Sequence, residues 1–408
     1  MHINLILSSL VALPFLELIL YVLVPARLTY LDTRMPKEFM AIFLAMAMIA
    51  CFAWRGQVRL QFSNKPLLLF LPWVFVSLMH SPNFQLKIGE FDITGFWNFK
   101  PALYVFIFFM LFTCLANRRF EHRDISQLLS VVSHCGLAMS AWAFIQMLGW
   151  DQVFFAVPAE LQSHPLKTGA GMSGSFGRPE LAACFVAMCF PASLYFKRYW
   201  HCLASVVMII LSKGDMAIAA ILVGTFVFFL ANNRAVMAAV AIFGLIFGAM
   251  VWKASSENPS FIQHTIGAKS NGRFPVWVQA ITDIRSQVFN ESKRTFAITG
   301  MGPGAFHYAF PIRHPQQAAW KQAHNDYVEL AYNYGFGGLA LFLLAIWVMI
   351  NRIKGYLCFW KVRALLAIFV SVAVGSFGNF LWQLGVFQLY TVVVAGFIHS
   401  LINFREAA

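Results

Sequence analysis

The amino-acid sequence predicts an all-α, polytopic membrane protein with about twelve transmembrane helices, on the strength of three observations. Hydrophobic residues make up 60% of the 408 residues, charged residues only 12%, and the mean hydropathy is +0.67. Apolar runs of about 20 residues, long enough to cross the hydrocarbon core of a bilayer, recur along the chain. The charged residues gather between these runs. We therefore expect residues 1–408 to form a single integral membrane domain.

The predicted spans follow one another with short connectors, except at one place. Their expected ranges are 3–25, 38–54, 66–80, 97–116, 126–148, 179–196, 199–212, 215–231, 235–252, 334–350, 363–380 and 385–403. The first span is longer than the apolar core of a signal peptide, so we expect it to be retained. One long polar interval, residues 253–323, forms a large loop between the ninth and tenth spans.

Lysine and arginine set the expected orientation of the spans. Excluding the long loop, the even-numbered connectors and the C-terminus hold about twice as many of these residues as the odd-numbered connectors, and positive charge favours the cytoplasmic side. Both termini are therefore expected in the cytoplasm. The long loop and the segments at 149–178 and 212–215 are expected together on the outer face.

The long loop is expected to contain short amphipathic helices. Asn271-Gly272-Arg273-Phe274-Pro275 leads into one of them, because proline suits a first helical turn. An apolar stripe at helical spacing follows, formed by Phe274, Trp277, Ile281 and Ile284. Such a helix is expected to lie at the outer membrane interface.

His324, at the end of the loop, is the candidate catalytic residue. It shares one helical stripe with the small residues Val328, Ala331, Gly335 and Gly338, which would let the helix pack closely against its neighbours. This setting suits a group that exchanges a proton with a polar substrate while it is held still. A purely structural histidine is the alternative. The other loop histidines are expected to be surface residues: His264, His307 and His314.

Three cations on the same face are candidate anion ligands. Arg273 precedes a helix start, where backbone N–H groups favour anions, and a guanidinium can hold a phosphate through two hydrogen bonds; alternatively, it reaches toward lipid headgroups. Arg178 follows a Gly-rich turn and would otherwise pair with Glu180. Lys213 lies in a hairpin between two spans and would otherwise pair with Asp215.

Several function classes receive little support. The cations lie singly or in pairs, which is typical of topology signals and not of nucleic-acid binding. None of the seven cysteines falls in the long loop, so neither disulfides nor a metal-ligand cluster are indicated. The outer face shows no paired carboxylates, which disfavours a hard metal ion. Residues 300–304 lack the context of a nucleotide-binding loop, so we expect a tight turn. One base with several cations suits a polyanionic leaving group.

Residues 299–339 resemble the signature region of the O-antigen ligase and O-antigen polymerase superfamily of bacterial envelope glycosyltransferases. In that family a periplasmic loop ends in His-Asn/Ser/Gln, nine further residues and Gly-x-x-Gly, and this chain has His324-Asn325 and then Gly335-Phe336-Gly337-Gly338. An upstream Gly-x-Gly-x-Gly-x-Phe is matched from Gly300 to Phe306, with Gly302 and Gly304 inside it. The family's Arg-x-x-x-Trp is matched by Arg273 and Trp277.

Weaker matches lie earlier in the chain. Gly174-Ser175-Phe176-Gly177-Arg178-Pro179-Glu180 is similar to a Gly-x-Phe-x-Asn-Pro-Asn segment of the family, and Ser212-Lys213-Gly214 to a Ser-Arg-Gly turn. Arg178, Glu180 and Lys213 depart from those patterns, which puts their roles in doubt. Residues 1–148 match the family in hydropathy alone.

The resemblance implies transfer of a glycan from undecaprenyl diphosphate to a sugar hydroxyl, at the periplasmic face of the bacterial inner membrane. No metal, cofactor or nucleotide sugar is implied. His324 would act as the general base, and Arg273 would hold the diphosphate, with Lys213 and Arg178 as further candidates for the same role. Displacement would invert the anomeric centre. Asn325, Gly302, Gly304, Gly335 and Gly338 are implied as motif residues with a structural role.

A ligase, which transfers to lipid A–core, is the leading interpretation. A polymerase, which transfers to the next repeat unit, has overlapping motifs and the same chemistry. A polysaccharide or lipid transporter is a third class, but transporters show repeated halves and midplane charges, and neither is visible here. Donor, acceptor and membrane lipids are the expected partners, and nucleic acid is not. The sugars, the linkage and the oligomeric state do not follow from the sequence.

Overall fold

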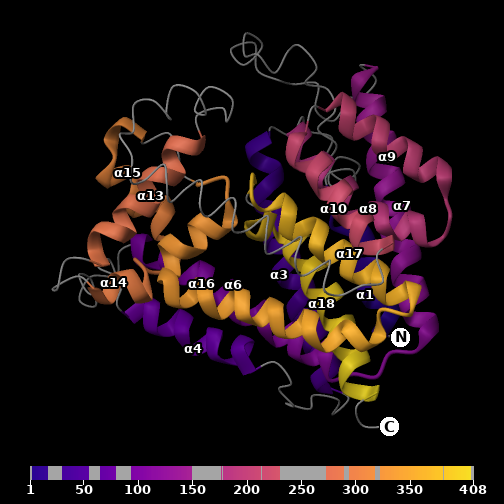
Figure 1. The fold of residues 1–408 in the computed structure, drawn as a ribbon, viewed down its shortest axis with the longest axis horizontal. Helices are drawn as coiled ribbons and strands as arrows, with labels where there is room; N and C mark the ends of the chain where they lie inside the picture. The colour runs from indigo at the N-terminus through magenta and orange to yellow at the C-terminus, as the bar shows by residue number, and fades with distance from the viewer. Residues whose placement is uncertain are drawn as a thin grey trace.

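The computed structural model describes residues 2–16, 30–54, 65–79, 93–148, 176, 178–212, 214–229, 273–288, 294–317, 322–379 and 381–405. Within these residues all regular secondary structure is helical (Figure 1). The predicted all-α fold class is therefore confirmed for the described residues.

The helices follow in chain order. The first eight are α1 (His2–Ala12), α3 (Tyr30–Trp54), α4 (Lys65–Met79), α6 (Ile93–Ala116), α7 (His122–Met147), α8 (Pro179–Tyr195), α9 (Tyr199–Leu211) and α10 (Asp215–Phe229). The next six are α13 (Arg273–Val288), α14 (Arg294–Thr299), α15 (Ala305–Arg313), α16 (Asp326–Ile353), α17 (Trp360–Gly375) and α18 (Gly385–Arg405). Short 3₁₀ turns are Pro315–Gln317, Lys354–Tyr356 and Leu381–Gln383.

A described helix lies over every predicted span except the ninth, 235–252. The ninth span and the second half of the first span fall outside the described residues. Four described helical segments are long and apolar enough to cross a membrane: Lys37–Trp54, His122–Met147, Asp326–Tyr356 and Gly385–Phe404. Shorter apolar helices include Pro179–Tyr195 and Asp215–Phe229. The total of twelve spans and the outer position of the long loop stay predictions.

The centre of the bundle is formed by α8 and α17, whose side chains are buried along almost their whole length. Small residues allow this close approach, as expected for helices that pack without bulky side chains between them. A side chain at Gly136 of α7 would collide with Cys189 of α8, and one at Gly224 of α10 would collide with Ser371 of α17. This bundle supports the described residues of the long loop.

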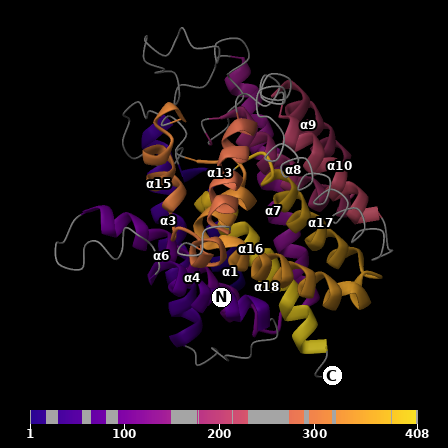
Figure 2. The same ribbon diagram turned by 60° about the vertical axis from the view of Figure 1, so that its left-hand side comes forward.

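The described part of the long loop forms a second hydrophobic cluster with the first half of α16. Phe274 and Trp277 of α13, Phe306 and Phe310 of α15, and Tyr332 of α16 are all buried there. Two views show α13 and α15 on one side of α16, away from α9 (Figures 1 and 2). The predicted helix after Arg273 is present. Its apolar stripe, however, packs against protein and not against a membrane surface, because α14, α15 and α16 cover it.

Candidate functional site

His324 lies directly before α16 with its backbone in the left-handed region, at φ 52°. Its side chain is buried, with 9% of its surface exposed. Among the described non-glycine residues, only Lys197 also has a positive φ. Such a conformation is unfavourable for a residue with a side chain and persists where the surroundings hold it. The contacts on either side of His324 are therefore informative.

The residues on both sides of His324 are tightly held. The Ala323 carbonyl accepts from Trp277 Nε1 at 2.5 Å, and the Ala323 N–H donates to Glu329 Oε2 at 3.1 Å. Asn325 is the N-cap of α16, and its Oδ1 accepts from two backbone N–H groups of the first turn at 3.0 and 3.1 Å. The Asn of the His-Asn motif thus starts the helix and gives His324 a rigid neighbour.

Asp326, the first residue of α16, forms hydrogen bonds with the connection between α17 and α18. Its N–H donates to the Ser376 carbonyl at 3.0 Å. Its carboxylate accepts from the Trp382 backbone N–H at 2.8 Å and from Gln383 Nε2 at 3.2 Å. Both Asp326 and Glu329 are buried beside His324. The expectation that no carboxylate pair lies at this site is therefore wrong.

Arg273 reaches the same α17–α18 connection from α13. One terminal nitrogen donates to the Gly378 carbonyl at 2.7 Å, and the other forms an ion pair with Glu180 Oε2 at 2.6 Å. The arginine side chain is 17% exposed. These contacts use two of the five N–H donors of the guanidinium, so three are left for a ligand within the part of the chain that the structure describes.

The connection from Ser376 to Gln383 therefore links the segment that holds His324 to Arg273: Asp326 binds both of its ends, and Arg273 binds Gly378 between them. Sequence reasoning missed this connection. A signal was available, because the predicted topology places the connector between the eleventh and twelfth spans on the same outer face as the long loop.

Of the other two predicted cations, the structure places Arg178, at the start of α8. Arg178 is the N-cap of α8, two residues before Glu180. Lys213 lies outside the described residues. A Cβ on its neighbour Gly214 would sit 3.0 Å from Ala183 Cβ, so this hairpin packs against the same turn. The structure thus brings Arg178, Arg273 and the hairpin toward one helix end, and their part in binding stays a prediction.

Lys37 of α3 is a further cation near this place. Its Nζ lies 4.8 Å from the ring centroid of Phe176, two residues before Arg178, and the lysine is buried. A cation held over an aromatic ring is a favourable contact, so the lysine has a defined place beside the start of α8.

The glycine-rich segment at 300–304 forms the predicted tight turn, with positive φ at Gly300, Gly302 and Gly304. The N–H groups of Met301 and Gly302 donate to carbonyls of α16 at 3.0 and 2.9 Å. The turn therefore packs against α16, and the N–H groups of Met301 and Gly302 are used for this packing and not for binding phosphate.

Gly335 and Gly338 lie where α16 is interrupted. Gly335 has φ 70° and ψ −179°, so its backbone is not helical. The carbonyl of Tyr334 that this break frees accepts from Trp73 Nε1 of α4 at 3.0 Å. The Trp73 ring lies against Gly338, where an added Cβ would come within 3.2 Å of it. The glycines of the stripe do pack closely, as predicted, but along a kinked helix. The prediction that His324 shares this helical stripe is wrong, because α16 begins at Asp326 and His324 has φ 52°.

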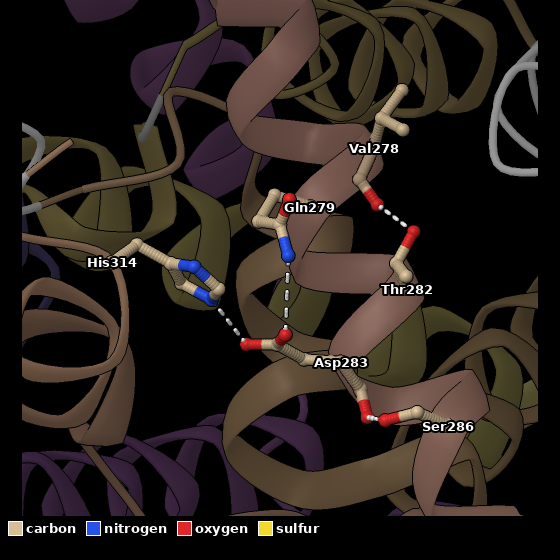
Figure 3. Close-up of polar contacts among 6 residues, drawn as sticks. All are labelled: Val278, Gln279, Thr282, Asp283, Ser286 and His314. Atoms are coloured by element: carbon tan, nitrogen blue, oxygen red, sulfur yellow. Dashed lines mark hydrogen bonds and ion pairs between the residues drawn. The ribbon is translucent and has the colours of Figure 1, made fainter. Parts of the chain in front are cut away.

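His314 is not the surface residue that the sequence analysis expected. Its Nε2 lies 2.8 Å from Asp283 Oδ2 of α13, and the two side chains are 19% and 13% exposed (Figure 3). Gln279 Nε2 donates to the other oxygen of Asp283 at 3.4 Å. The pair ties the end of α15 to α13. His307 is exposed as predicted, and His264 lies outside the described residues.

Within the described ranges, no group of three or more His, Cys, Asp or Glu side chains is arranged to hold a metal ion. The chemistry that this site offers is a held imidazole, buried carboxylates that accept backbone N–H groups, and a guanidinium with donors to spare.

Comparison with known families gives one match. Residues 200–343 match a family model described as O-antigen ligase. The matched range contains Arg273, the glycine turn, His324 and Gly338. The match supports the resemblance to the O-antigen ligase and polymerase superfamily and a glycosyltransferase of that type. No curated protein matches the chain.

Proposed function

We propose that the chain is an O-antigen ligase-type enzyme, on the premise that residues 200–343 match the O-antigen ligase family model. It transfers a glycan from undecaprenyl diphosphate to a sugar hydroxyl of lipid A–core, at the periplasmic face of the inner membrane. The observation that carries this proposal is the connection at 376–383, which links the held His324 segment to the Arg273 guanidinium.

His324 acts as the general base in this reaction. Its imidazole takes the proton of the acceptor hydroxyl while the hydroxyl oxygen attacks the anomeric carbon of the donor. A new glycosidic bond forms as the bond from the anomeric carbon to the phosphate oxygen breaks. The bonding electron pair leaves with undecaprenyl diphosphate, and the imidazole passes its proton to water. Single displacement inverts the anomeric centre.

Arg273 holds the leaving diphosphate. Its free N–H donors can make charge-assisted hydrogen bonds to phosphate oxygens, and these strengthen as negative charge grows on the leaving group. Glu180 and the Gly378 carbonyl orient the guanidinium before the substrate binds. Arg178, at the N-cap of α8, adds positive charge next to Glu180, and Lys213 is proposed to add more. The reaction needs no metal ion, because the leaving group is already a stable polyanion.

A deletion of the gene in its own host tests the proposal. The expected result on a lipopolysaccharide gel is loss of all O-antigen from the core, with carrier-linked polymer accumulating. Single repeats still attached to the core would indicate a polymerase instead. An unchanged gel would contradict both assignments.

Complementation of that deletion tests the residues. His324→Ala is expected to lower turnover by about 10²–10⁴-fold, the usual contribution of a general base, and Arg273→Ala should lower donor binding and turnover together. The matched controls are His307→Ala, an exposed histidine of the same loop, and Arg285→Ala at the other end of α13. Full complementation by His324→Ala or Arg273→Ala, at normal protein levels, would refute the role assigned to that residue.

A further inference from the structure

Glu329, one turn into α16, has no role in the reaction described above, yet its carboxylate is buried at the site. It is 7% exposed and accepts the N–H of Ala323, which is itself fully buried. Burying a carboxylate is unfavourable unless hydrogen bonds compensate. The N-terminal turn of a helix also favours a negative charge. The fold therefore keeps a polar group here that an apolar residue could replace if packing alone were needed.

The Ala323 residue that Glu329 binds is held from two directions. Glu329 of α16 takes its N–H, and Trp277 of α13 donates to its carbonyl at 2.5 Å. The next residue along the chain is His324, whose left-handed backbone needs such support. Rotation of the Ala323 backbone would turn the backbone of His324 and so move its imidazole.

Trp277 lies one helical turn after Arg273 on α13. The residue before the candidate base is therefore attached to the helix that begins with the candidate diphosphate ligand. The hydrogen bond from Trp277 to Ala323 therefore links the helix that begins at Arg273 to the residue before His324.

We propose that Glu329 is a positioning residue for glycan transfer, whose carboxylate holds the Ala323 backbone and thereby sets the orientation of the His324 imidazole. The proposal rests on the proposed function of His324. What the role requires of residue 329 is a hydrogen-bond acceptor at the right place. A negative charge is not required, so a glutamine should serve nearly as well.

The test compares Glu329→Ala with Glu329→Gln. Purified full-length protein in detergent is assayed with the carrier-linked glycan that accumulates in the deletion strain, and with lipid A–core from the same strain. We expect Glu329→Ala to lower kcat about 10²-fold, as a displacement of about 1 Å does, while the KM for the donor changes little. Glu329→Gln should restore most of kcat.

Asn333 supplies the matched control on the same helix. Its Oδ1 accepts the buried backbone N–H of Phe306 at 2.9 Å. Asn333 is 8% exposed and Glu329 is 7% exposed, so the two side chains are buried to nearly the same degree. Asn333→Ala therefore removes the same kind of bond without touching Ala323. It should lower the melting temperature as much as Glu329→Ala does, with kcat close to that of the wild type.

The outcomes separate the two proposals. An inactive His324→Ala with a fully active Glu329→Ala would overturn the positioning role alone. A Glu329→Gln variant as slow as Glu329→Ala would also overturn it, because the carboxylate would then act through its charge. An active His324→Ala would remove the proposed function and this inference with it. Should Glu329→Ala fail to fold, Trp277→Phe removes the other hydrogen bond to Ala323 and should lower kcat in the same way; an unchanged kcat there would count against the proposal.

Discussion

Replacing Gly335 by alanine should destabilise the protein strongly, because the position combines an unusual backbone with a close backbone contact. Its φ of 70° and ψ of −179° lie in a region that only glycine adopts readily. An added Cβ would lie 2.1 Å from the Ile298 carbonyl oxygen and 2.6 Å from the Gly300 nitrogen. Both neighbours are backbone atoms, so neither can move aside by changing a side-chain rotamer.

The size of the effect follows from these two terms. Backbone strain of this kind costs about 1–3 kcal/mol, and forcing an extra carbon into a packed place costs about 1–3 kcal/mol more. The sum is about 2–6 kcal/mol. This is a large part of the free energy of unfolding of a folded domain, which is roughly 5–15 kcal/mol. The glycine turn at 300–304 should separate from α16 as a consequence.

Thermal unfolding of the purified protein in detergent measures this prediction. Gly355→Ala is the matched control, since it lies just after the same helix and a Cβ there would meet no atom within 4 Å. We expect a clearly lower midpoint for Gly335→Ala and no loss for Gly355→Ala. Equal midpoints for the two variants would refute the reasoning.

Three further predictions concern packing, the ion pair and metal dependence. Trp73→Phe keeps the ring but removes the donor to the Tyr334 carbonyl, so thermal unfolding should show a loss of about 1 kcal/mol, and an unchanged midpoint would contradict it. Asp283→Ala and His314→Ala should be coupled by about 0.5–3 kcal/mol in a double-mutant cycle of unfolding free energies, since the pair is mostly buried; strict additivity would show that the pair contributes nothing. Excess EDTA should leave the initial transfer rate unchanged, whereas a loss that Mg²⁺ restores would refute the metal-independent mechanism.

Helix positions were largely predictable from the sequence, and small-residue spacing indicated a helix from about His324, but hydropathy alone did not place the start of α16. The tenth span was expected from residue 334, and the helix begins at Asp326. Hydropathy misses the first two turns because Asp326 and Glu329 look like exposed residues. They are buried because partners from other elements, the N–H groups of Trp382 and Ala323, satisfy their carboxylates.

The same limit applies to the charged residues of the site. Arg273 was expected to be free for a ligand or for lipid, and Glu180 to be a partner of Arg178. In the structure Arg273 and Glu180 form an ion pair across 93 residues of chain. No local pattern contains that pairing, because it depends on how α13 is placed over the start of α8. His314 was misjudged for the same reason, as its partner Asp283 lies on another helix.

By itself the sequence determined the all-α class, the places of the apolar helices, the tight turn at 300–304 and the segment that holds the candidate base. These features depend on residues close together in the chain: helical periodicity, apolar length, and glycine where φ must be positive. Only the tertiary structure decided that the 376–383 connection joins His324 to Arg273 and that Trp277 and Glu329 hold the residue before the histidine. Such contacts arise when distant segments pack together, and the cost of leaving buried polar groups without partners then selects which side chains meet.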